Sequence, residues 1–334
     1  MQEYSKRLGQ ISAQQFQAAL HRLQLGDYVK AEPVPFGLFG QNVFLTSMQG
    51  QFVFRGLPHY PWQFPTEQFI VHQLHERTRA PVPYPYLLEP TSDIFGWSFA
   101  IMPRMPGLQL LDQTVASPLT TDDRLEIARA LARMLVEVQT LTWEYVGKYD
   151  LETNNVKPFE KHYREWIVDR IREKVAAAQS ANDHTTPSDV EWIEILISNA
   201  KSVLKLAYQP CAVMGDYGEH NVLVMNTEGQ WQVSAVFDLM TAHFGDGPAD
   251  LSLQVTAYLN GNEPLADAFV AGYLRLKPMQ PGFVEHQQLY MLDLKLSFWH
   301  YWQSHQGSMP GEKESISFEQ WARPSVEYWD KYRS

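Results

Sequence analysis

Cysteine is nearly absent from this chain: Cys211 is the only one among 334 residues. A single thiol cannot build a disulfide framework or a multi-cysteine zinc site, so both are excluded within one chain. The apolar residues Ala212, Val213 and Met214 that follow predict a buried strand, in which Cys211 is an inert core thiol. A reducing, cytoplasmic setting is the expectation that follows.

Runs of basic residues and long apolar runs are also missing. Asp and Glu outnumber Lys and Arg by 38 to 27, so the formal net charge is -11. Without a basic face for phosphates, a nucleic-acid partner is not expected. No window approaches the roughly 18 consecutive apolar residues of a membrane span, and the first ten residues lack the apolar stretch of a signal peptide. The acidic balance favours a neutral or cationic partner over an anionic one.

Apolar and aromatic residues, in contrast, are plentiful. They make up 45% and 13% of the chain, which is enough to bury a sizeable core and excludes disorder. The length favours about two domains, or one large two-lobed unit.

The spacing of apolar residues predicts strands early in the chain and mainly helices later. A helix at 12–24 precedes strands at 28–35, 42–47 and 51–55, a helix from Pro65 to about Arg79, and strands near 86–89 and 97–102. The stretch 102–107 breaks this pattern, which indicates a hinge. Helices are then expected at 122–140 with Thr121 as cap, 158–178, 189–207, 248–260, 264–275 and 284–304, and a group of strands at 211–237. Strands followed by helices predict an α+β fold.

Three oxygen-bearing side chains are spaced around one short loop system. Asp216 follows a short apolar strand, Asn221 lies five residues later, and Asp238 ends a third strand. An Asp can orient an acceptor hydroxyl and take its proton, while an Asn and a second Asp can hold a Mg²⁺ that bridges nucleotide phosphates. Each residue alone is equally typical of a turn or a strand end. Together, at this spacing, they predict phosphoryl transfer.

These residues also carry a resemblance to a known family. Gly215-Asp216, Asn221 and Asp238, followed by the segment GDGPADL at 245–251, look like the motifs of the aminoglycoside phosphotransferase and choline kinase-like family. The resemblance spans roughly residues 30–260. It implies a two-lobed protein-kinase-like fold, with a β-rich N-terminal lobe and a mainly helical C-terminal lobe. It also implies that Asp216 is the catalytic aspartate and that Asn221 and Asp238 hold magnesium.

The sequence departs from the family pattern near these motifs. Met214 stands where the family usually has His, and Gly247 separates Asp246 from Pro248. Asp246 and Asp250 flank a predicted helix start, where carboxylates cap the helix and meet its dipole. We interpret both as supports of the site and not as participants in the reaction.

A second group of residues is expected to bind the nucleotide. Arg55 ends a predicted strand, and Glu67 lies on the apolar stripe of the following helix, where a carboxylate needs a partner. Arg55 is the natural partner, and the resemblance implies that it contacts phosphates; a structural ion pair without a ligand is the alternative. The resemblance further implies nucleotide contacts in the turn between strands and at the hinge, from Gly37, Gly40, Asn42, Met102, Pro103 and Met105.

The expected protein is therefore a cytoplasmic, Mg²⁺-dependent kinase that moves the γ-phosphate of ATP or GTP to a hydroxyl of a small molecule. The acceptor is expected to be an aminoglycoside, a sugar or an amino alcohol, with a cationic acceptor favoured by the net charge. Residues 1–103 form the nucleotide-binding lobe and 104–334 the catalytic and substrate-binding lobe. Two alternatives stay open: a catalytically silent relative that binds nucleotide or a metabolite, and a carboxylate-based metal hydrolase.

Overall fold

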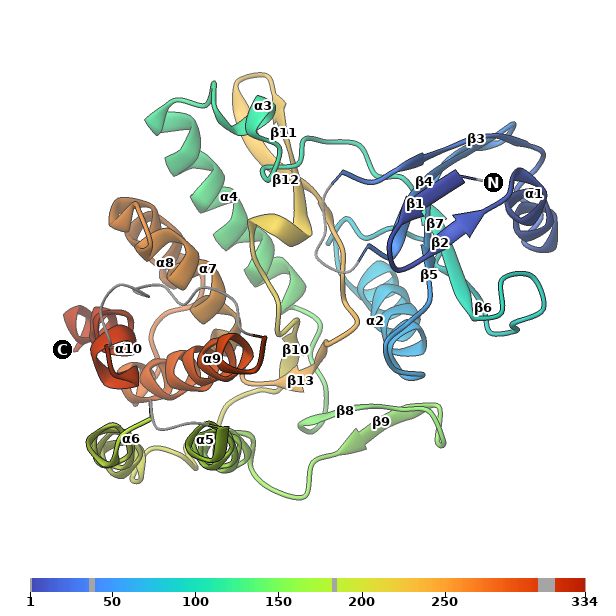
Figure 1. Ribbon diagram of the computed structural model, residues 1–334. Coiled ribbons are helices and arrows are strands. Elements are labelled where there is room, and N and C mark those ends of the chain that lie inside the picture. The colour runs from blue at the N-terminus through green and yellow to red at the C-terminus, as the bar shows by residue number, and fades with distance from the viewer. Residues whose placement is uncertain (1, 36–39, 182–184, 306–315, 334) are drawn as a thin grey trace.

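The chain folds into a β-rich lobe and a larger helical lobe that lie side by side (Figure 1). The computed structural model describes residues 2–35, 40–181, 185–305 and 316–333. In the smaller lobe, a five-stranded antiparallel sheet has the order β3-β4-β5-β7-β6. Its elements are β3 (Tyr28–Pro33), β4 (Asn42–Ser47), β5 (Gly50–Gly56), β6 (Leu87–Glu89) and β7 (Phe99–Pro103), with the hairpin β1 (Gln2–Ser5) and β2 (Gly9–Ile11) and the helices α1 (Ala13–Arg22) and α2 (Gln63–Arg77) packed around them.

The larger lobe is built mainly of helices. They are the short α3 (Gln113–Ala116), α4 (Thr121–Val138), α5 (Tyr163–Ala181), α6 (Pro187–Ala200), α7 (Leu251–Leu259), α8 (Glu263–Leu276), α9 (Phe283–His305) and α10 (Phe318–Glu327), followed by the 3-10 turn η3 (Tyr328–Tyr332). Two small sheets interrupt them. One is the hairpin β11 (Val222–Thr227) and β12 (Gln230–Val236), and the other has the order β10 (Cys211–Val213), β13 (His243–Gly245), β8 (Gly147–Asp150), β9 (Asn155–Pro158).

This architecture confirms the predicted α+β class, with sheet first and helices after it. Several helix boundaries were predicted incorrectly. Helix α2 begins at Gln63, so Pro65 lies inside its first turn, where the missing N–H is not needed. Helix α4 is capped by Thr120 and not by Thr121, since the Thr120 hydroxyl accepts a hydrogen bond from the N–H of Asp123.

The hairpin of β8 and β9 was not predicted, and α5 begins at Tyr163 and not at 158. Both strands have only four residues, and most of their side chains are polar or exposed. Such short segments carry no clear period-two pattern. The hairpin lies below α2 in the view of Figure 1, and β8 contacts that helix.

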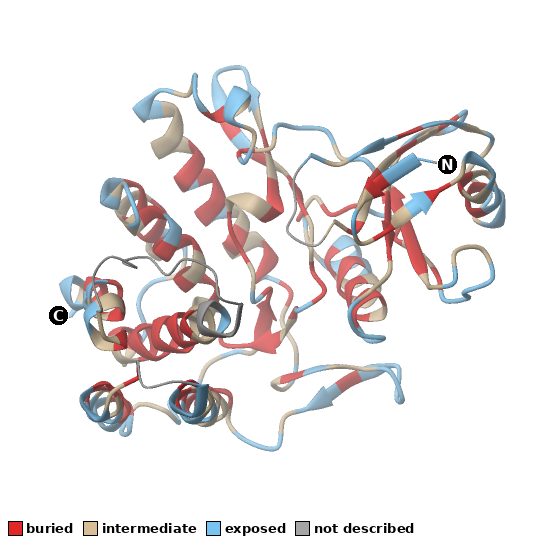
Figure 2. Cartoon of the chain, viewed as in Figure 1, coloured by how far each residue is buried: buried red, intermediate tan, exposed pale blue. Residues whose placement is uncertain are grey.

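The core is divided unevenly between the lobes. Buried residues line the inner faces of the sheet and helices (Figure 2). One cluster joins α1 to the sheet of the smaller lobe. A second cluster fills the larger lobe and also includes Ile70, Val71 and Leu74 of α2. Helix α2 is thus packed into the core of the larger lobe, and this fixes its position relative to the site.

The connection after β7 passes very close to β11 and β12. A Cβ at Gly107 would lie 2.2 Å from the Ser234 hydroxyl oxygen, and φ there is +137°, so glycine is required on both grounds. Leu108 and Val224 exchange backbone hydrogen bonds of 2.8 and 3.0 Å. The segment after β7 is thereby held against the hairpin of β11 and β12, which Asn221 precedes and Asp238 follows.

Candidate active site

The loop that carries Asp216 is held at its start by a buried carboxylate. Asp250 accepts hydrogen bonds from the N–H groups of Met214 at 2.7 Å and Gly215 at 2.8 Å. The Thr241 hydroxyl donates to the Met214 carbonyl at 2.8 Å. Gly215 has φ +76°, which favours glycine at this turn. The Met214 side chain is fully buried, so the position is supported by packing and by Asp250.

Asp216 itself is positioned by residues four and five places further on. Asn221 donates from Nδ2 to the carbonyl oxygen and to Oδ2 of Asp216, both at 2.9 Å. His220 Nε2 lies 3.2 Å from Oδ1 of the same carboxylate. Burial opposes the charged form of His220, but the hydrogen bond and charge of Asp216 outweigh burial and raise the pKa of His220. Asp216 stays 45% exposed, so its carboxylate faces the solvent-filled site.

Asp238 lies beside this loop, just after β12. Its φ is +62°, a left-handed conformation that Asp tolerates better than most residues. Oδ1 lies 3.1 Å from Nη2 of Arg55. Burial raises the pKa of Asp238; Arg55 acts against this, while the charges of Glu67 and Asp216 raise it further. Asp216 and Asp238, the two predicted carboxylates, therefore lie near enough for the charge of Asp216 to raise the pKa of Asp238.

The predicted pair of Arg55 and Glu67 is confirmed. Arg55 Nη1 lies 2.5 Å from Glu67 Oε2, and both side chains are almost fully buried. Arg55 also donates from Nε to Asn42 Oδ1 at 3.0 Å. The other Glu67 oxygen accepts from the Leu239 N–H at 3.0 Å, and the Tyr86 hydroxyl donates to Oε2 at 2.8 Å. Glu67 thus ties α2 both to β5 and to the segment that carries Asp238.

The remaining predicted nucleotide residues lie along the edge of the smaller lobe. Gly37 falls outside the described residues. Gly40 has φ +58° and its carbonyl accepts from the Ser5 hydroxyl. Met102 is buried in β7 opposite Val53. Pro103 and Met105, at the end of that strand and beyond it, are partly exposed.

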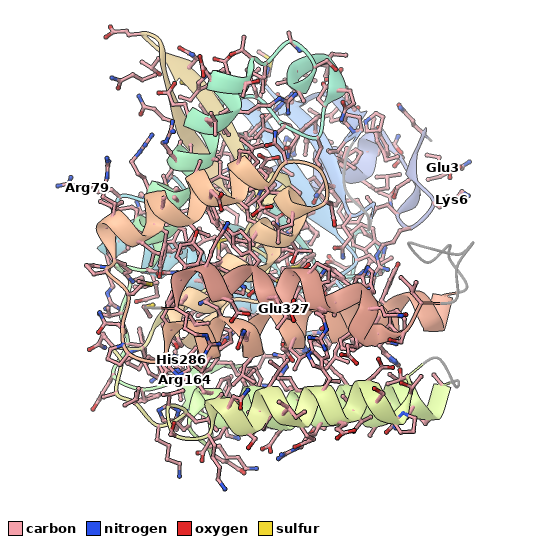
Figure 3. All side chains as sticks on the ribbon, turned by 90° about the vertical axis from the view of Figure 1, so that its left-hand side faces the viewer. Glu3, Lys6, Arg79, Arg164, His286 and Glu327 are labelled. Carbon is pink, nitrogen blue, oxygen red and sulfur yellow. The ribbon has the colours of Figure 1, made fainter. Side chains whose placement is uncertain are left out.

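Asp246 supports the site through contacts with other helices and not, as predicted, by capping a helix. Neither Asp246 nor Asp250 caps a helix through its side chain. Asp246 instead accepts from Arg164 Nε at 2.8 Å and from the Tyr290 hydroxyl at 2.5 Å, which joins the loop to α5 and α9. Figure 3 shows Arg164 beside His286, and burial together with the Arg164 charge lowers the pKa of that histidine.

The residues of α5 that line a cavity beside the Asp216 loop were not predicted. A cavity of about 800 Å³ adjoins Asp216, bounded by the hairpin of β8 and β9 and by α5 and α9. Tyr163, Trp166 and Arg170 line it from one face of α5. Their i, i+3, i+7 spacing was the available sequence signal.

The donor set near the loop fits magnesium. Among the described residues, no group of three or more His, Cys, Asp or Glu could hold a metal ion by itself. Mg²⁺ does not need such a group, because it is usually held by one or two protein oxygens and the phosphates of a nucleotide. Asp238 offers a carboxylate. Asn221 has turned its Nδ2 to Asp216, which leaves its carbonyl oxygen as the acceptor.

Comparisons with known proteins agree with this geometry. The model of the phosphotransferase enzyme family matches residues 30–286. The chain therefore belongs to this phosphotransferase family. No curated protein sequence matches the chain.

Solved structures share the fold over nearly the whole chain. A candidate aminoglycoside phosphotransferase from Ralstonia eutropha JMP134 has 16% identity and a TM-score of 0.66, with 97% of this chain and 98% of that one covered. A thermostable mutant of aminoglycoside phosphotransferase APH(4)-Ia, in a ternary complex with ADP and hygromycin B, has 14% identity, a TM-score of 0.64 and coverage of 94% and 97%. A candidate fructosamine-3-kinase from Thermobifida fusca YX-ER1 has 16% identity, a TM-score of 0.62 and coverage of 94% and 98%. These likenesses confirm the kinase-like fold.

In the described part of the chain, no helix combines the length and apolar character needed to cross a membrane.

Proposed function

We propose that this protein is a Mg²⁺-dependent small-molecule kinase that transfers the γ-phosphoryl group of ATP or GTP to an alcohol. The observation that carries the proposal is the convergence of Asp216, Asn221 and Asp238 around one loop, inside a fold of the phosphotransferase family. Structures with this fold hold ADP in one case and GDP in another, which supports a nucleotide donor.

In the proposed reaction, Asp216 accepts a hydrogen bond from the acceptor hydroxyl, aligns its oxygen with the γ-phosphorus and takes its proton. Asn221 fixes the Asp216 carboxylate through Nδ2. His220 lies on the other carboxylate oxygen and limits its rotation. Bound through Asn221 and Asp238, Mg²⁺ would offset the charge of the nucleotide phosphates.

The nucleotide is proposed to lie between a small lobe of residues 1–103 and a large lobe of residues 104–334. Arg55, held by Glu67, would contact its phosphates. The resemblance adds Gly37, Gly40 and Asn42 as proposed nucleotide contacts. The strand end of Met102, Pro103 and Met105 would meet the base, through the Pro103 carbonyl and the Met105 N–H. A guanidinium suits this place because it stays charged and can hold phosphate oxygens as a fork.

We propose a cytoplasmic location, because ATP and GTP are supplied there. A catalytically silent protein that binds nucleotide is the second candidate, favoured by Met214 at the position where the family usually has His. Asp250 and Thr241 hold that position without an imidazole, which favours the active enzyme.

Replacing the proposed catalytic carboxylate separates the two candidates. We expect Asp216→Asn to lower the rate of nucleotide-dependent phosphorylation of a responsive alcohol by about 10²- to 10⁴-fold, because the acceptor hydroxyl loses its base. Transfer is measured over a panel of aminoglycosides, sugars and amino alcohols, together with binding of Mg·ADP.

The control is Asp122→Asn, which changes an exposed carboxylate in the first turn of α4 and should keep the wild-type rate. Equal transfer by wild type and Asp216→Asn would contradict the proposed role. Binding of Mg·ADP without transfer to any acceptor would favour the silent protein.

A further inference from the structure

The N-terminal hairpin of β1 and β2 contacts the part of the small lobe that is proposed to bind the nucleotide. It precedes the segment 30–286 that the family model matches. Its apolar residues Tyr4, Leu8 and Ile11 are buried in the core of the small lobe. These apolar contacts anchor the hairpin, while two of its polar side chains bind other segments.

Ser5 holds the turn between β3 and β4 at Gly40. The Ser5 hydroxyl donates to the Gly40 carbonyl at 2.5 Å and accepts from the Leu8 N–H at 3.1 Å. The approach is close, since a Cβ at Gly40 would lie 2.9 Å from Cβ of Ser5. Glycine allows many backbone conformations, and the contact with Ser5 favours one of them here.

Arg7 binds the segment that follows β5. Its Nε and Nη2 donate to the Leu57 carbonyl at 3.2 and 2.8 Å. The buried Gln41 side chain donates to the same carbonyl at 2.7 Å, and the Gln41 carbonyl accepts from the Gly56 N–H at 2.9 Å. The Leu57 carbonyl thus links the hairpin to the start of β4 and to the end of β5.

The two strand ends held in this way carry proposed nucleotide contacts. Asn42 begins β4 and pairs with Arg55 near the end of β5. Asn42 Oδ1 accepts from Arg55 Nε at 3.0 Å. The opposite ends of these strands are joined by the tight turn at 47–50. The contacts of Ser5 and Arg7 therefore close the strand pair at its open end.

Order at this open end affects the binding of a ligand. A turn that contains glycine has many accessible conformations, and fixing one of them on binding costs free energy. Contacts that hold the turn in one conformation before the ligand arrives reduce that cost and raise affinity. The hairpin supplies such contacts from outside the two strands.

We infer that the N-terminal hairpin, through Ser5 and Arg7, pre-orders the open end of β4 and β5 for the phosphates of a nucleotide and thereby raises nucleotide affinity. Ser5 and Arg7 are positioning residues, which act through the backbone at Gly40 and Leu57. The inference rests on the proposed function, since it concerns the nucleotide of the same site. Because coupling between two sites is reciprocal, a bound nucleotide should also stabilise the hairpin.

Binding of Mg·ADP to the full chain tests the inference. Isothermal titration calorimetry compares the wild type with Ser5→Ala and Arg7→Gln. Each variant should bind about three- to fivefold more weakly, which is the effect of a typical hydrogen bond on an equilibrium. Arg7→Lys keeps a donor for the Leu57 carbonyl and should recover part of the loss.

A matched control separates positioning from general destabilisation. Ser12→Ala removes the hydroxyl that caps α1 by accepting from the Gln15 N–H, away from the open end of the strands. It should lower the free energy of unfolding about as much as Ser5→Ala, because each variant loses a side-chain hydrogen bond. Its affinity for Mg·ADP should equal that of the wild type. Urea unfolding of all variants checks that they fold and compares their stabilities.

Hydrogen exchange measures the reciprocal effect. Mg·ADP should slow amide exchange in residues 2–11 of the wild type, and less so in Ser5→Ala. A hairpin with a purely structural role would exchange at the same rate with and without the nucleotide.

Wild-type affinity in both Ser5→Ala and Arg7→Gln would overturn the inference. So would an equal loss of affinity in Ser12→Ala, or hairpin exchange that does not respond to Mg·ADP. In each of these cases the wild type still binds the nucleotide. Failure of the proposed function differs, because the wild type then binds no Mg·ADP, which removes the inference as well, or transfers phosphate without Asp216.

Discussion

Two histidines in the large lobe have pKa values that move in opposite directions. His220 lies beside the Asp216 carboxylate, and this partner raises its pKa despite burial. His243 lies among rings and a hydroxyl, and burial lowers its pKa to about 4. The same side chain thus binds its proton more tightly beside Asp216 and more weakly in the wall of the cavity.

The His243 environment predicts a pH-dependent stability. Its pKa is about 4 in the folded chain and about 6.5 when unfolded, so the unfolded chain binds an extra proton between these values. Stability should fall as pH drops from about 6.5 to about 4, by at most about 3 kcal/mol from this group. Urea unfolding across this window should show a smaller fall for His243→Gln. The exposed His21→Gln is the control; a wild-type slope in His243→Gln would contradict the assignment.

At the scale of elements, the site depends on how α2 is connected to β5 and to the end of β12. Glu67 of α2 accepts hydrogen bonds from Arg55 of β5 and from Leu239, which follows β12. It also accepts one from Tyr86 in the loop before β6. The strand that carries Arg55 and the segment that carries Asp238 are far apart in sequence. Glu67 therefore acts as the joint that positions the proposed phosphate and metal ligands together.

Neutralising this joint should destabilise the fold. In Glu67→Gln, Arg55 stays buried with Asp238 as its remaining charged partner, and breaking such a pair costs about 3 kcal/mol or more. Urea denaturation measures the loss, and binding of Mg·ADP should weaken as well. Glu76→Gln, on the exposed side of the same helix, should change the free energy of unfolding by less than about 0.5 kcal/mol. A loss below about 1 kcal/mol in Glu67→Gln would show that the pair contributes little.

At the scale of the whole molecule, the two lobes share part of their core. Apolar residues of α2 lie in the cluster that fills the large lobe, and Leu108, which follows β7, is hydrogen bonded to Val224 of β11. The small-lobe sheet with α1 has its own cluster. A ligand between the lobes would therefore contact α2, which packs in the core of the large lobe, and the small-lobe sheet, which has a core of its own.

Nucleotide binding between the lobes should raise the melting temperature of the whole chain, because a ligand that binds only the folded state stabilises it. At about 100 times its dissociation constant, a nucleotide adds about 2.7 kcal/mol. The shift of the melting temperature is compared between ATP and GTP, and for each nucleotide between Mg²⁺ and a chelator. The first comparison shows which nucleotide binds, and the second shows whether binding depends on the metal. Asp238→Asn should lose the Mg²⁺-dependent part of the shift. A shift that is the same with chelator would argue against the proposed metal ligands.

Local sequence patterns predicted much of the element order. Periodicity predicted α1, the strands β3, β4 and β5 and most large-lobe helices, because each of these has a regular apolar face. The pairing of Arg55 with Glu67 was also predictable, since a carboxylate on an apolar stripe needs a partner. The hairpin of β8 and β9 was not, because four-residue strands with polar side chains have no such face.

By itself, the sequence determined the α+β class, the loop with Asp216 and Asn221, and the family, since these depend on spacings within short segments. Only the tertiary structure decided that Asp250 supports that loop by binding its N–H groups and not by capping a helix, that Glu67 joins α2 to other segments, and that residues of α5 line the cavity beside Asp216. The physical reason is that these contacts join residues distant in sequence. No local pattern encodes which helix face turns toward which loop; that is settled when the chain packs its two core clusters.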